Sequence, residues 1–436
     1  MPKADTIFEG MLRIKMALFS AVLILMFSLS PARLAGEGQD LYGNIADYLN
    51  MIYGIDGNAG LTAFPVLNIP MGGRSESIIA FSAISNDITF LELNPAGSSM
   101  LQRSELAFFH NNWIADSKIE GIAYATRFGD IGIAAGARWL YMPFTEYNYY
   151  GERVSGGYYS EGVAILNASY NFFSSYYFSG VSIGINLKGA FRLMPDYTDN
   201  NDNILSGSGL SQSAVMAMAD IGLLTRFDFL KGYSSREKNA SAAIVARNLG
   251  PPALGDPLPT AVTAAFSYKP IRPLTFGFDF TLPLNLMDLS LSEMPYMSLG
   301  ASVNVTEFLT MNAGFLYKAG SSRIAIGSTL VFNRIAIEVN YTLDLLTQLQ
   351  PLNRVSLAVR LDLGDNGRQV MSDRVDELYL LGLEAFSRRN FTYARVCWEE
   401  ALRLNPRYSP AMESLAILGE IEVLEERIDA LYRLNF

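Results

Sequence analysis

Cysteine and histidine are almost absent from this 436-residue chain, which contains one of each, Cys397 and His110. One cysteine cannot form an internal disulfide bond. One histidine and one cysteine are also too few ligands for a structural zinc site. The sequence also shows no nucleophile elbow, phosphate-binding loop or other catalytic constellation. We therefore expect a protein that is not an enzyme, with no catalytic residue, no metal site and no cofactor.

Charged residues are also few, and no long apolar run follows the first thirty residues. Only 17% of the residues are charged, whereas a soluble protein carries about 25%, and 50% are hydrophobic. A helical membrane protein would show apolar blocks of about 20 residues. High apolarity without such blocks is typical of strands in which every second side chain faces lipid. The net charge of −10 argues against nucleic acid as a partner, because nucleic acid requires a basic face.

The N-terminus has the features of a secretion signal. Two basic residues precede an apolar run at residues 16–29, and small residues follow it. The run is too short for a transmembrane anchor, which needs about 20 apolar residues. We predict export by a signal peptide within residues 1–36, with either Met1 or Met11 as the true start.

Residues 104–364 alternate between apolar and polar side chains in strand-length pieces. In residues 274–282, Leu or Phe occupies every even position, and Asp279 lies among the polar residues between them. A charged side chain on the lipid face costs free energy, so Asp279 is expected to face the interior, and this sets the register of its strand. The pattern predicts an all-β transmembrane barrel of about fourteen antiparallel strands. The predicted strands are residues 104–113, 118–128, 131–142, 159–172, 176–192, 213–229, 240–249, 260–269, 273–283, 295–304, 308–318, 321–333, 335–345 and 353–363.

The connections between these strands differ in length on the two sides of the predicted barrel. The tight turns are residues 129–130, 173–175, 305–307 and 333–334. The long connections are residues 143–158, 193–212, 250–259, 284–294 and 346–352, and 230–239 is long where a short turn is expected. Short periplasmic turns and long outer loops are typical of outer-membrane barrels.

Aromatic residues gather at the ends of the predicted strands. Trp113, Trp139 and Tyr141 fall at loop ends, and a second set falls near the turns. Two such bands are the girdles expected at the membrane interfaces. A soluble β-sandwich also has alternating strands, but it would not explain the girdles or the side-dependent loop lengths.

The composition changes abruptly after Gly364. Residues 375–433 are charged and have a helical period, and residues 375–408 fit the 34-residue tetratricopeptide (TPR) pattern. Since about three repeats are needed for independent stability, we expect this TPR-like tail, residues 370–436, to pack on the barrel rim, on a partner protein or on a second copy. The expected packing residues are Leu378, Leu381, Gly382, Phe391, Ala394, Trp398, Ala401 and Pro406.

Residues 37–103 lie between the signal and the first predicted strand. They contain Gly72-Gly73-Arg74 and, further on, the run of Asn94, Pro95, Ala96 and Gly97. The proline biases Asn94 away from helical backbone, so the run predicts a short, stiff corner. The alternative is that this corner only starts the first hairpin.

These motifs and the strand series resemble the FadL family of long-chain fatty-acid channels and the spirochaete outer-membrane proteins grouped near it. The resemblance covers about residues 71–363, and residues 246–250 followed by Leu258 and Pro259 also look like a family feature. In that family, a glycine-rich, Asp-containing segment that ends in Asn-Pro-Ala forms a hatch inside a fourteen-stranded barrel. The resemblance thus implies a lumenal hatch within residues 37–103 that includes the run from Asn94 to Gly97.

The resemblance further implies a hatch-gated outer-membrane channel for long-chain fatty acids or similar hydrophobic nutrients, surrounded by outer-membrane lipids. A fatty-acid path needs a cation or hydrogen-bond donors for the carboxylate. Alternation places four candidate cations inside the barrel, namely Lys188, Arg192, Arg323 and Arg360. For each of them the alternative is an ordinary ion pair with a lumenal carboxylate such as Asp220, Asp228, Glu338 or Asp362.

The TPR-like tail departs from the fatty-acid channels and leaves a second function open. The barrel would then act as an anchor, or as a secretion or assembly component, that recruits a periplasmic protein through residues 370–436. Apolar stretches in two predicted outer loops, 142–150 and 284–291, indicate either a ligand-capture groove or a membrane-surface anchor. Both functions place the barrel in the outer membrane and the tail in the periplasm.

Overall fold

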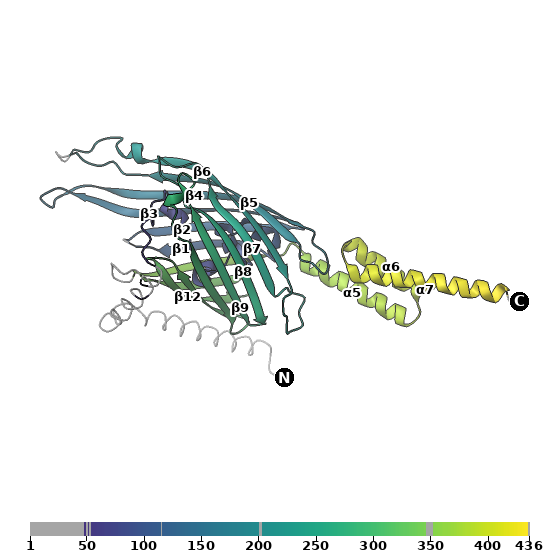
Figure 1. The fold of residues 1–436 in the computed structure, drawn as a ribbon. Helices are drawn as coiled ribbons and strands as arrows, with labels where there is room; N and C mark the ends of the chain where they lie inside the picture. Colours follow the sequence, from purple (N-terminus) through teal and green to yellow (C-terminus); the bar gives the residue numbers. More distant parts are fainter. Residues whose placement is uncertain are drawn as a thin grey trace. The chain divides into compact units, whose positions relative to one another are not determined.

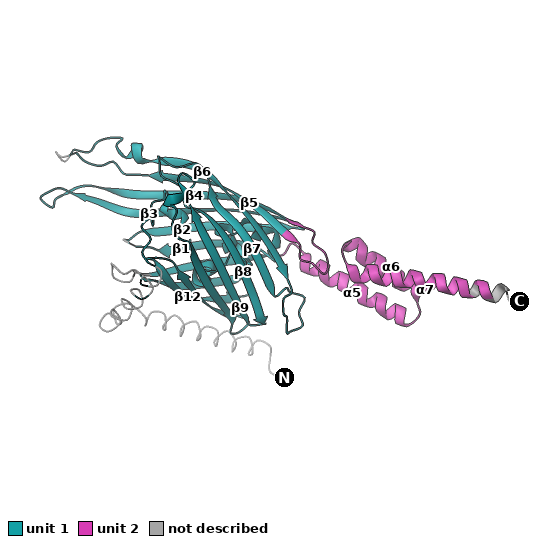
Figure 2. Ribbon diagram, viewed as in Figure 1, with its two compact units in different colours: residues 1–170, 182–363 teal, residues 171–181, 364–436 magenta. Residues whose placement is uncertain are grey.

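The computed structural model describes residues 48, 51, 54–114, 116–199, 203–345 and 352–434. The signal peptide predicted within residues 1–36 lies outside them. The chain divides into two compact units, Met1–Tyr170 with Ser182–Leu363, and Asn171–Val181 with Gly364–Phe436 (Figure 2).

In the described part of the first unit, fourteen antiparallel strands close into one barrel (Figure 1). Each strand pairs with its neighbours in sequence, and β14 returns to β1. This arrangement confirms the predicted fourteen-stranded barrel of the outer-membrane type. The strands are β1 (Ser104–Asn112), β2 (Lys118–Phe128), β3 (Ile131–Tyr147), β4 (Arg153–Phe172), β5 (Val181–Leu193), β6 (Ala214–Phe227), β7 (Ala240–Leu249), β8 (Thr260–Ile271), β9 (Leu274–Leu284), β10 (Tyr296–Asn304), β11 (Leu309–Tyr317), β12 (Ser322–Phe332), β13 (Ile335–Leu345) and β14 (Leu352–Gly364).

Side chains alternate between the two faces of the barrel wall. In β9, Phe276, Phe278 and Phe280 are exposed on the outer surface, whereas Asp279 between them is buried. Asp279 pairs in register with Ser298 of β10, which is also buried. The outer face is therefore apolar and the inner face polar, as in outer-membrane barrels.

Trp113 does not occupy the girdle position predicted for it. It follows the inward-facing residues Phe109 and Asn111, and the Arg354 guanidinium lies 3.7 Å from its ring centroid. Residues two apart on a strand share a face, so the alternation from Phe109 onward turns Trp113 toward the interior. Trp139, by contrast, is exposed on the outer surface.

The β3–β4 hairpin is longer than predicted. The sequence predicts a loop at residues 143–158, but the strand ladder continues as far as the pair of Tyr147 and Arg153. Continued pairing satisfies the backbone groups of this stretch, which would otherwise need water. The turn itself is short, and Asn148 Oδ1 accepts a hydrogen bond from the N–H of Glu152 (2.9 Å).

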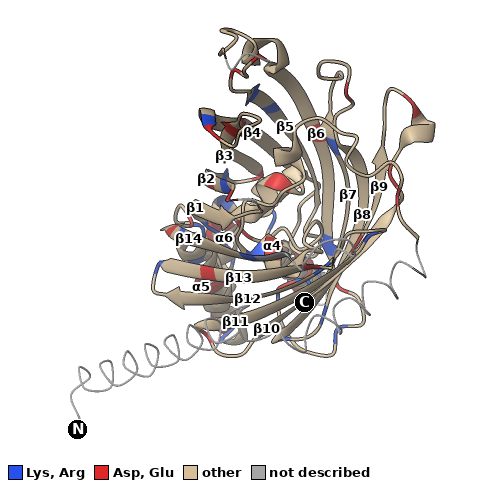
Figure 3. Cartoon of the chain, turned by 90° about the vertical axis from the view of Figure 1, so that its left-hand side faces the viewer, with Lys and Arg blue, Asp and Glu red and all other residues tan. Residues whose placement is uncertain are grey.

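Residues 63–101, called here the interior segment, fill the middle of the barrel. They form η1 (Pro65–Leu67), α4 (Arg74–Ile78), η2 (Ile88–Glu92) and η3 (Pro95–Met100). Since α4 contacts β10 to β13 while η3 contacts β2, β3 and β6, the strands surround the segment. Figure 3 shows α4 inside the ring of strands. Most side chains of the segment are buried.

The described part of the second unit contains three helices, α5 (Arg368–Ser387), α6 (Phe391–Leu404) and α7 (Ser409–Leu434). Helix α5 begins at Arg368, before the predicted start at 375. The Asp365 carboxylate, two residues before the N-cap position, accepts a hydrogen bond from the N–H of Gln369 (2.6 Å) in the first turn. Gly367, the N-cap residue of α5, has a φ of 78°, which is the left-handed backbone that glycine adopts without strain.

Trp398 lies at the centre of the α5–α6 pair. Its side chain is buried, and its indole N–H donates to the carbonyl of Tyr379 (3.2 Å). The ring lies against Gly382, where an added Cβ would come within 2.2 Å of Nε1, so only glycine allows this approach. Of the predicted packing residues, Leu378, Gly382, Ala394, Trp398 and Ala401 are buried, Leu381 and Phe391 are half-buried, and Pro406 is exposed between α6 and α7.

We expect Gly382→Ala to destabilise the α5–α6 pair, because the new methyl group overlaps the Trp398 ring and overpacking a core costs about 1–3 kcal/mol. Limited proteolysis of the full chain, with cleavage in α5 to α7 read by mass spectrometry, measures the effect. Gly419→Ala in α7 is the matched control, since a Cβ there meets nothing within 4 Å. Equal cleavage rates in the two variants would contradict the tight Gly382 contact.

Candidate functional site

At several inward-facing glycines, called glycine seats here, the interior segment approaches the barrel wall closely. A Cβ on Gly184 of β5 would lie 2.2 Å from the Pro95 carbonyl oxygen, and one on Gly222 of β6 would lie 2.3 Å from Asn94 Oδ1. Glycine weakens a strand interior and often marks a site where another backbone approaches closely. A Cβ would also come within 3.0 Å of the segment at Gly132, Gly277, Gly300, Gly314 and Gly327.

Asn94 and Pro95 form a buried corner between η2 and η3. Asn94 Oδ1 accepts from the N–H of Ala96 (3.0 Å), and its Nδ2 donates to the carbonyl of Ser82 (2.9 Å). The wall contributes as well, because Asn167 of β4 donates to the Pro95 carbonyl (2.9 Å). The corner starts η3 and not the first hairpin, since β1 begins only at Ser104.

Arg360 of β14 connects the wall to the interior segment. Its guanidinium lies 3.2 Å from Asp87 of the segment, 3.1 Å from Glu338 of β13 and 3.5 Å from Glu105 of β1. Burial by itself would raise the pKa of the Asp87 carboxyl, but Arg360 and Arg74 outweigh burial and hold that pKa below its ordinary value. Asp87 thus has two arginines, Arg74 and Arg360, as its neighbouring cations.

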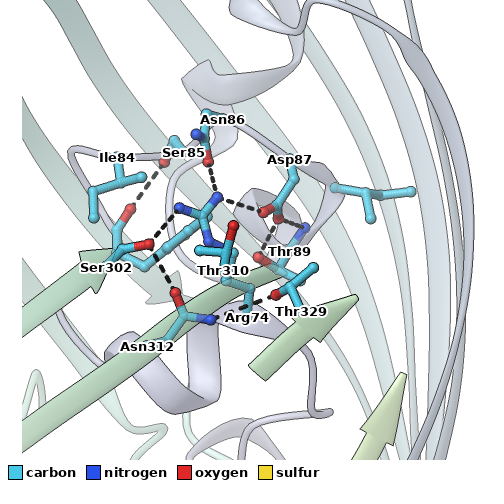
Figure 4. A network of polar contacts seen from close by, with 12 residues as sticks. Arg74, Ile84, Ser85, Asn86, Asp87, Thr89, Ser302, Thr310, Asn312 and Thr329 are labelled. Atoms are coloured by element: carbon cyan, nitrogen blue, oxygen red, sulfur yellow. Dashed lines mark hydrogen bonds and ion pairs between the residues drawn. The ribbon is translucent and has the colours of Figure 1, made fainter. Parts of the chain in front are cut away.

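Arg74 of α4 makes the second connection to the wall, shown in Figure 4. Its guanidinium donates to Asn86 Oδ1 (2.9 Å) and to Ser302 Oγ of β10 (3.1 Å), and it lies 3.4 Å from Asp87. Ser302 in turn donates to Asn312 of β11 (2.8 Å). This network connects α4 to two neighbouring strands.

Two further arginines, which lie on other strands of the wall, also bind the interior segment. Arg138 of β3 forms a buried ion pair with Glu92 of η2 and donates to the Ile69 carbonyl (3.0 Å). Arg226 of β6 donates to backbone carbonyls of the segment, among them that of Ser85 (3.2 Å). Both arginines occupy inward positions of their strands, so the alternation argument applied to Lys188 would have identified them from the sequence.

The four cations predicted as ligand contacts do not form one cluster. Lys188 is buried 2.6 Å from Asp220, Arg192 lies 5.4 Å from the Phe64 ring centroid, and Arg323 lies 2.7 Å from Asp344. Lys188 and Arg360 therefore make ion pairs with Asp220 and Glu338, two of the carboxylates that the sequence offered as alternatives, and Arg323 pairs with another carboxylate. The predicted partners Asp228 and Asp362 pair elsewhere, with Lys231 and Lys238 and with Arg103.

A cavity of about 230 Å³ lies between the interior segment and the wall. Arg247 and Lys318 line it together with the apolar side chains of Ile79, Leu93 and Leu316. Lys318 pairs with Glu293, whereas Nε of Arg247 is buried without a hydrogen-bond partner among the described residues, and the Arg247 charge acts on the carboxyl group of Asp279. Glu76, Glu92 and Asp279 line it as well, so the cavity presents charges of both signs beside some apolar surface.

Two carboxylates of the cavity wall differ in their surroundings. Asp279 Oδ2 accepts from the N–H of Ser82 (3.1 Å), while its Oδ1 has no donor among the described residues. Glu76 of α4 accepts from the Thr342 hydroxyl (3.1 Å), and burial raises the pKa of its carboxyl although the hydroxyls and Arg354 oppose the rise. In the described residues, no group of three His, Cys, Asp or Glu side chains is placed to hold a metal ion.

Sequence comparison decides the family. The profile of UPF0164, described as an uncharacterised protein family, matches residues 54–366. The chain belongs to this family. A UPF0164 protein of Treponema pallidum (strain Nichols) is 29% identical over 399 residues, which is 88% of this chain and 89% of the relative. A second UPF0164 protein of that strain is 25% identical over 394 residues, 83% of this chain and 76% of the relative.

Two solved structures are also similar to this UPF0164 chain. The Pseudomonas putida toluene transporter TodX has a TM-score of 0.42 and 14% identity, over 67% of this chain and 95% of TodX. A Pseudomonas aeruginosa FadL homologue has a TM-score of 0.39 and 10% identity, over 66% of this chain and 97% of the homologue. At these identities the likeness concerns the fold. The family match includes the interior segment and the barrel but ends before α5.

We expect Arg360→Ala to destabilise the protein by about 3–5 kcal/mol, because the change removes the positive charge that the buried carboxylates of Asp87, Glu105 and Glu338 share. Denaturant unfolding of the full chain in lipid bilayers, followed by tryptophan fluorescence, measures the loss. Arg103→Ala is the control: this side chain is 62% exposed in its pair with Asp362, so the loss should stay below about 1 kcal/mol. Similar losses in both variants would show that Arg360 is not a structural connection.

Proposed function

We propose that the chain is an outer-membrane channel for hydrophobic or amphipathic compounds, with the interior segment as its hatch. The observation that carries this proposal is the fit between segment and wall, in which glycine seats and buried polar contacts hold one folded segment across the lumen. A barrel of fourteen strands is too wide for its own side chains to fill. The hatch closes a lumen that would otherwise admit water and ions.

The class of compound follows from the resemblance of the sequence to the FadL family and from the surfaces along the path. Exposed apolar side chains on an outer loop, Leu286, Met287 and Leu289, are suited to capture of an apolar molecule. Glu76, Glu92 and Asp279 line the cavity beside the hatch, and Arg247 shares this cavity with apolar side chains. This combination suits an anionic head group with adjoining carbons, as in a long-chain fatty acid.

The tail supports a second candidate function. We propose that the chain is exported by its N-terminal signal and that α5 and α6 form a TPR-like unit in the periplasm. Apolar side chains such as Leu380, Tyr393 and Val396 are exposed on these helices. Recruitment of a periplasmic protein through them would make the barrel an anchor, and absence of both conductance and fatty-acid binding in the tests below would favour this function.

Gly222→Val should open the channel to ions. The new side chain would overlap Asn94 and Pro95, so the hatch cannot remain seated. In planar lipid bilayers, the unchanged protein should conduct poorly and the variant should conduct well. Gly189→Val in the neighbouring strand β5 is the control, because a Cβ there meets nothing within 4 Å. An unchanged conductance in Gly222→Val would argue against a hatch.

Arg247→Gln should weaken the binding of labelled oleate to the reconstituted protein about 10- to 100-fold, because a hydrogen bond to a charged group contributes about 1.5–3 kcal/mol. Binding of oleyl alcohol, which lacks the carboxylate, should not change. Arg334→Gln, at an exposed turn position, is the control for the loss of a positive charge. If oleate does not bind above the level of an unrelated porin, the fatty-acid assignment is wrong.

A further inference from the structure

Helix α7 is much longer than its partner in the tail. It has 26 residues and α6 has 14, so at about 1.5 Å per residue it extends roughly 18 Å further. Arg395, in the first turns of α6, forms an ion pair with Glu422 of α7. The two helices therefore lie side by side as far as residue 422, and the following residues of α7 extend beyond α6.

A narrow apolar stripe begins at Ile417, beside α6, and continues along this extension. Ile417, Ile421, Leu424, Ile428 and Leu431 follow one another at spacings of four, three, four and three residues. Four of them are exposed, by 54% at Ile417, 55% at Leu424, 50% at Ile428 and 61% at Leu431. The buried core of the tail ends at Leu418, so none of these five side chains belongs to it.

The spacing is that of the a and d positions of a heptad repeat. A stripe confined to these positions is the seam of a coiled coil, whereas a helix that packs on a globular core has a wider apolar face. Ile421 and Ile428 occupy a, and Leu424 and Leu431 occupy d. The spacing therefore favours another helix over a groove or a lipid surface as the occupant of the stripe.

The charges beside the seam identify that helix. Glu420 and Arg427 both occupy the g position, seven residues apart. When two copies of α7 pair antiparallel, so that Ile421 of one copy packs against Leu424 of the other, Glu420 of each copy lies opposite Arg427 of its partner copy. The seam is thus complementary to itself, as a twofold contact requires. In a parallel pair, Glu420 would instead face Glu425, which has the same charge.

We propose that residues 417–431 of α7 bind the same residues of a second copy of this chain in an antiparallel two-stranded coiled coil. The tail would then join two channels through their helices. This inference is independent of the proposed transport function, because it rests on the second unit alone.

The molar mass of the full chain in detergent, corrected for bound detergent by light scattering, tests the pairing. The unchanged protein should contain two chains per particle, and Leu424→Glu combined with Ile428→Glu should contain one. Val423→Glu is the matched control, because Val423 is 48% exposed on the same helix but lies outside the stripe. A single chain in the unchanged protein, two chains in the double variant, or dissociation of the control would each overturn the proposal.

An exchange of the charges at positions 420 and 427 distinguishes a loss of helix pairing from a loss of folding. Arg427→Glu places like charges at both ends of the antiparallel seam, so it should shift the protein toward single chains. Adding Glu420→Arg to the same chain restores opposite charges and should restore two chains per particle. Failure of this rescue would overturn the antiparallel pairing.

Discussion

The structure depends on one constraint: irregular backbone inside a membrane barrel must find hydrogen-bond partners there. The interior segment has only short helical pieces, so its own secondary structure cannot supply them all. The wall supplies the rest. Its side chains donate to carbonyls of the segment, as Asn340 does to Gly73 (2.8 Å), and accept from its N–H groups, as Glu105 does from Ile88 (2.8 Å). Segment and wall therefore form one polar network.

This network explains why glycine and charge occur together on the inner face. Glycines such as Gly184 and Gly300 let the backbone of the segment approach the wall, and the longer side chains between them reach its polar groups. Buried ion pairs contribute little net stability, but breaking one of them is costly. The pairs at Arg138 and Arg360 thus favour one position of the segment over others. A segment held in this way has one defined position, and moving it would require water or a ligand to replace the lost partners.

Much of the barrel could be predicted from the sequence, because alternation is a local property. Each strand must present apolar side chains to lipid and polar ones to the interior, so strand positions and facing follow from neighbouring residues. The predictions were wrong at strand ends, where lipid does not impose this alternation. The β3–β4 hairpin continues beyond the predicted loop, and β5 begins at Val181 instead of 176. Trp113 was assigned to a girdle by residue type, although its parity with Phe109 turns it inward.

The sequence by itself therefore determined the barrel, its strand number, the helices of the tail and the inward facing of side chains within the strands, such as Asp279 and Lys188. Only the tertiary structure decided which of these side chains meet. Arg360 and Asp87 are far apart in the chain, and their contact depends on the closure of the barrel around the segment. In the same way, Lys188 was predicted to face inward, but its buried partner Asp220 comes from another strand. Which face of the wall a side chain occupies depends on the two-residue period of its strand. Which side chains contact each other depends on distances that only the closed barrel determines.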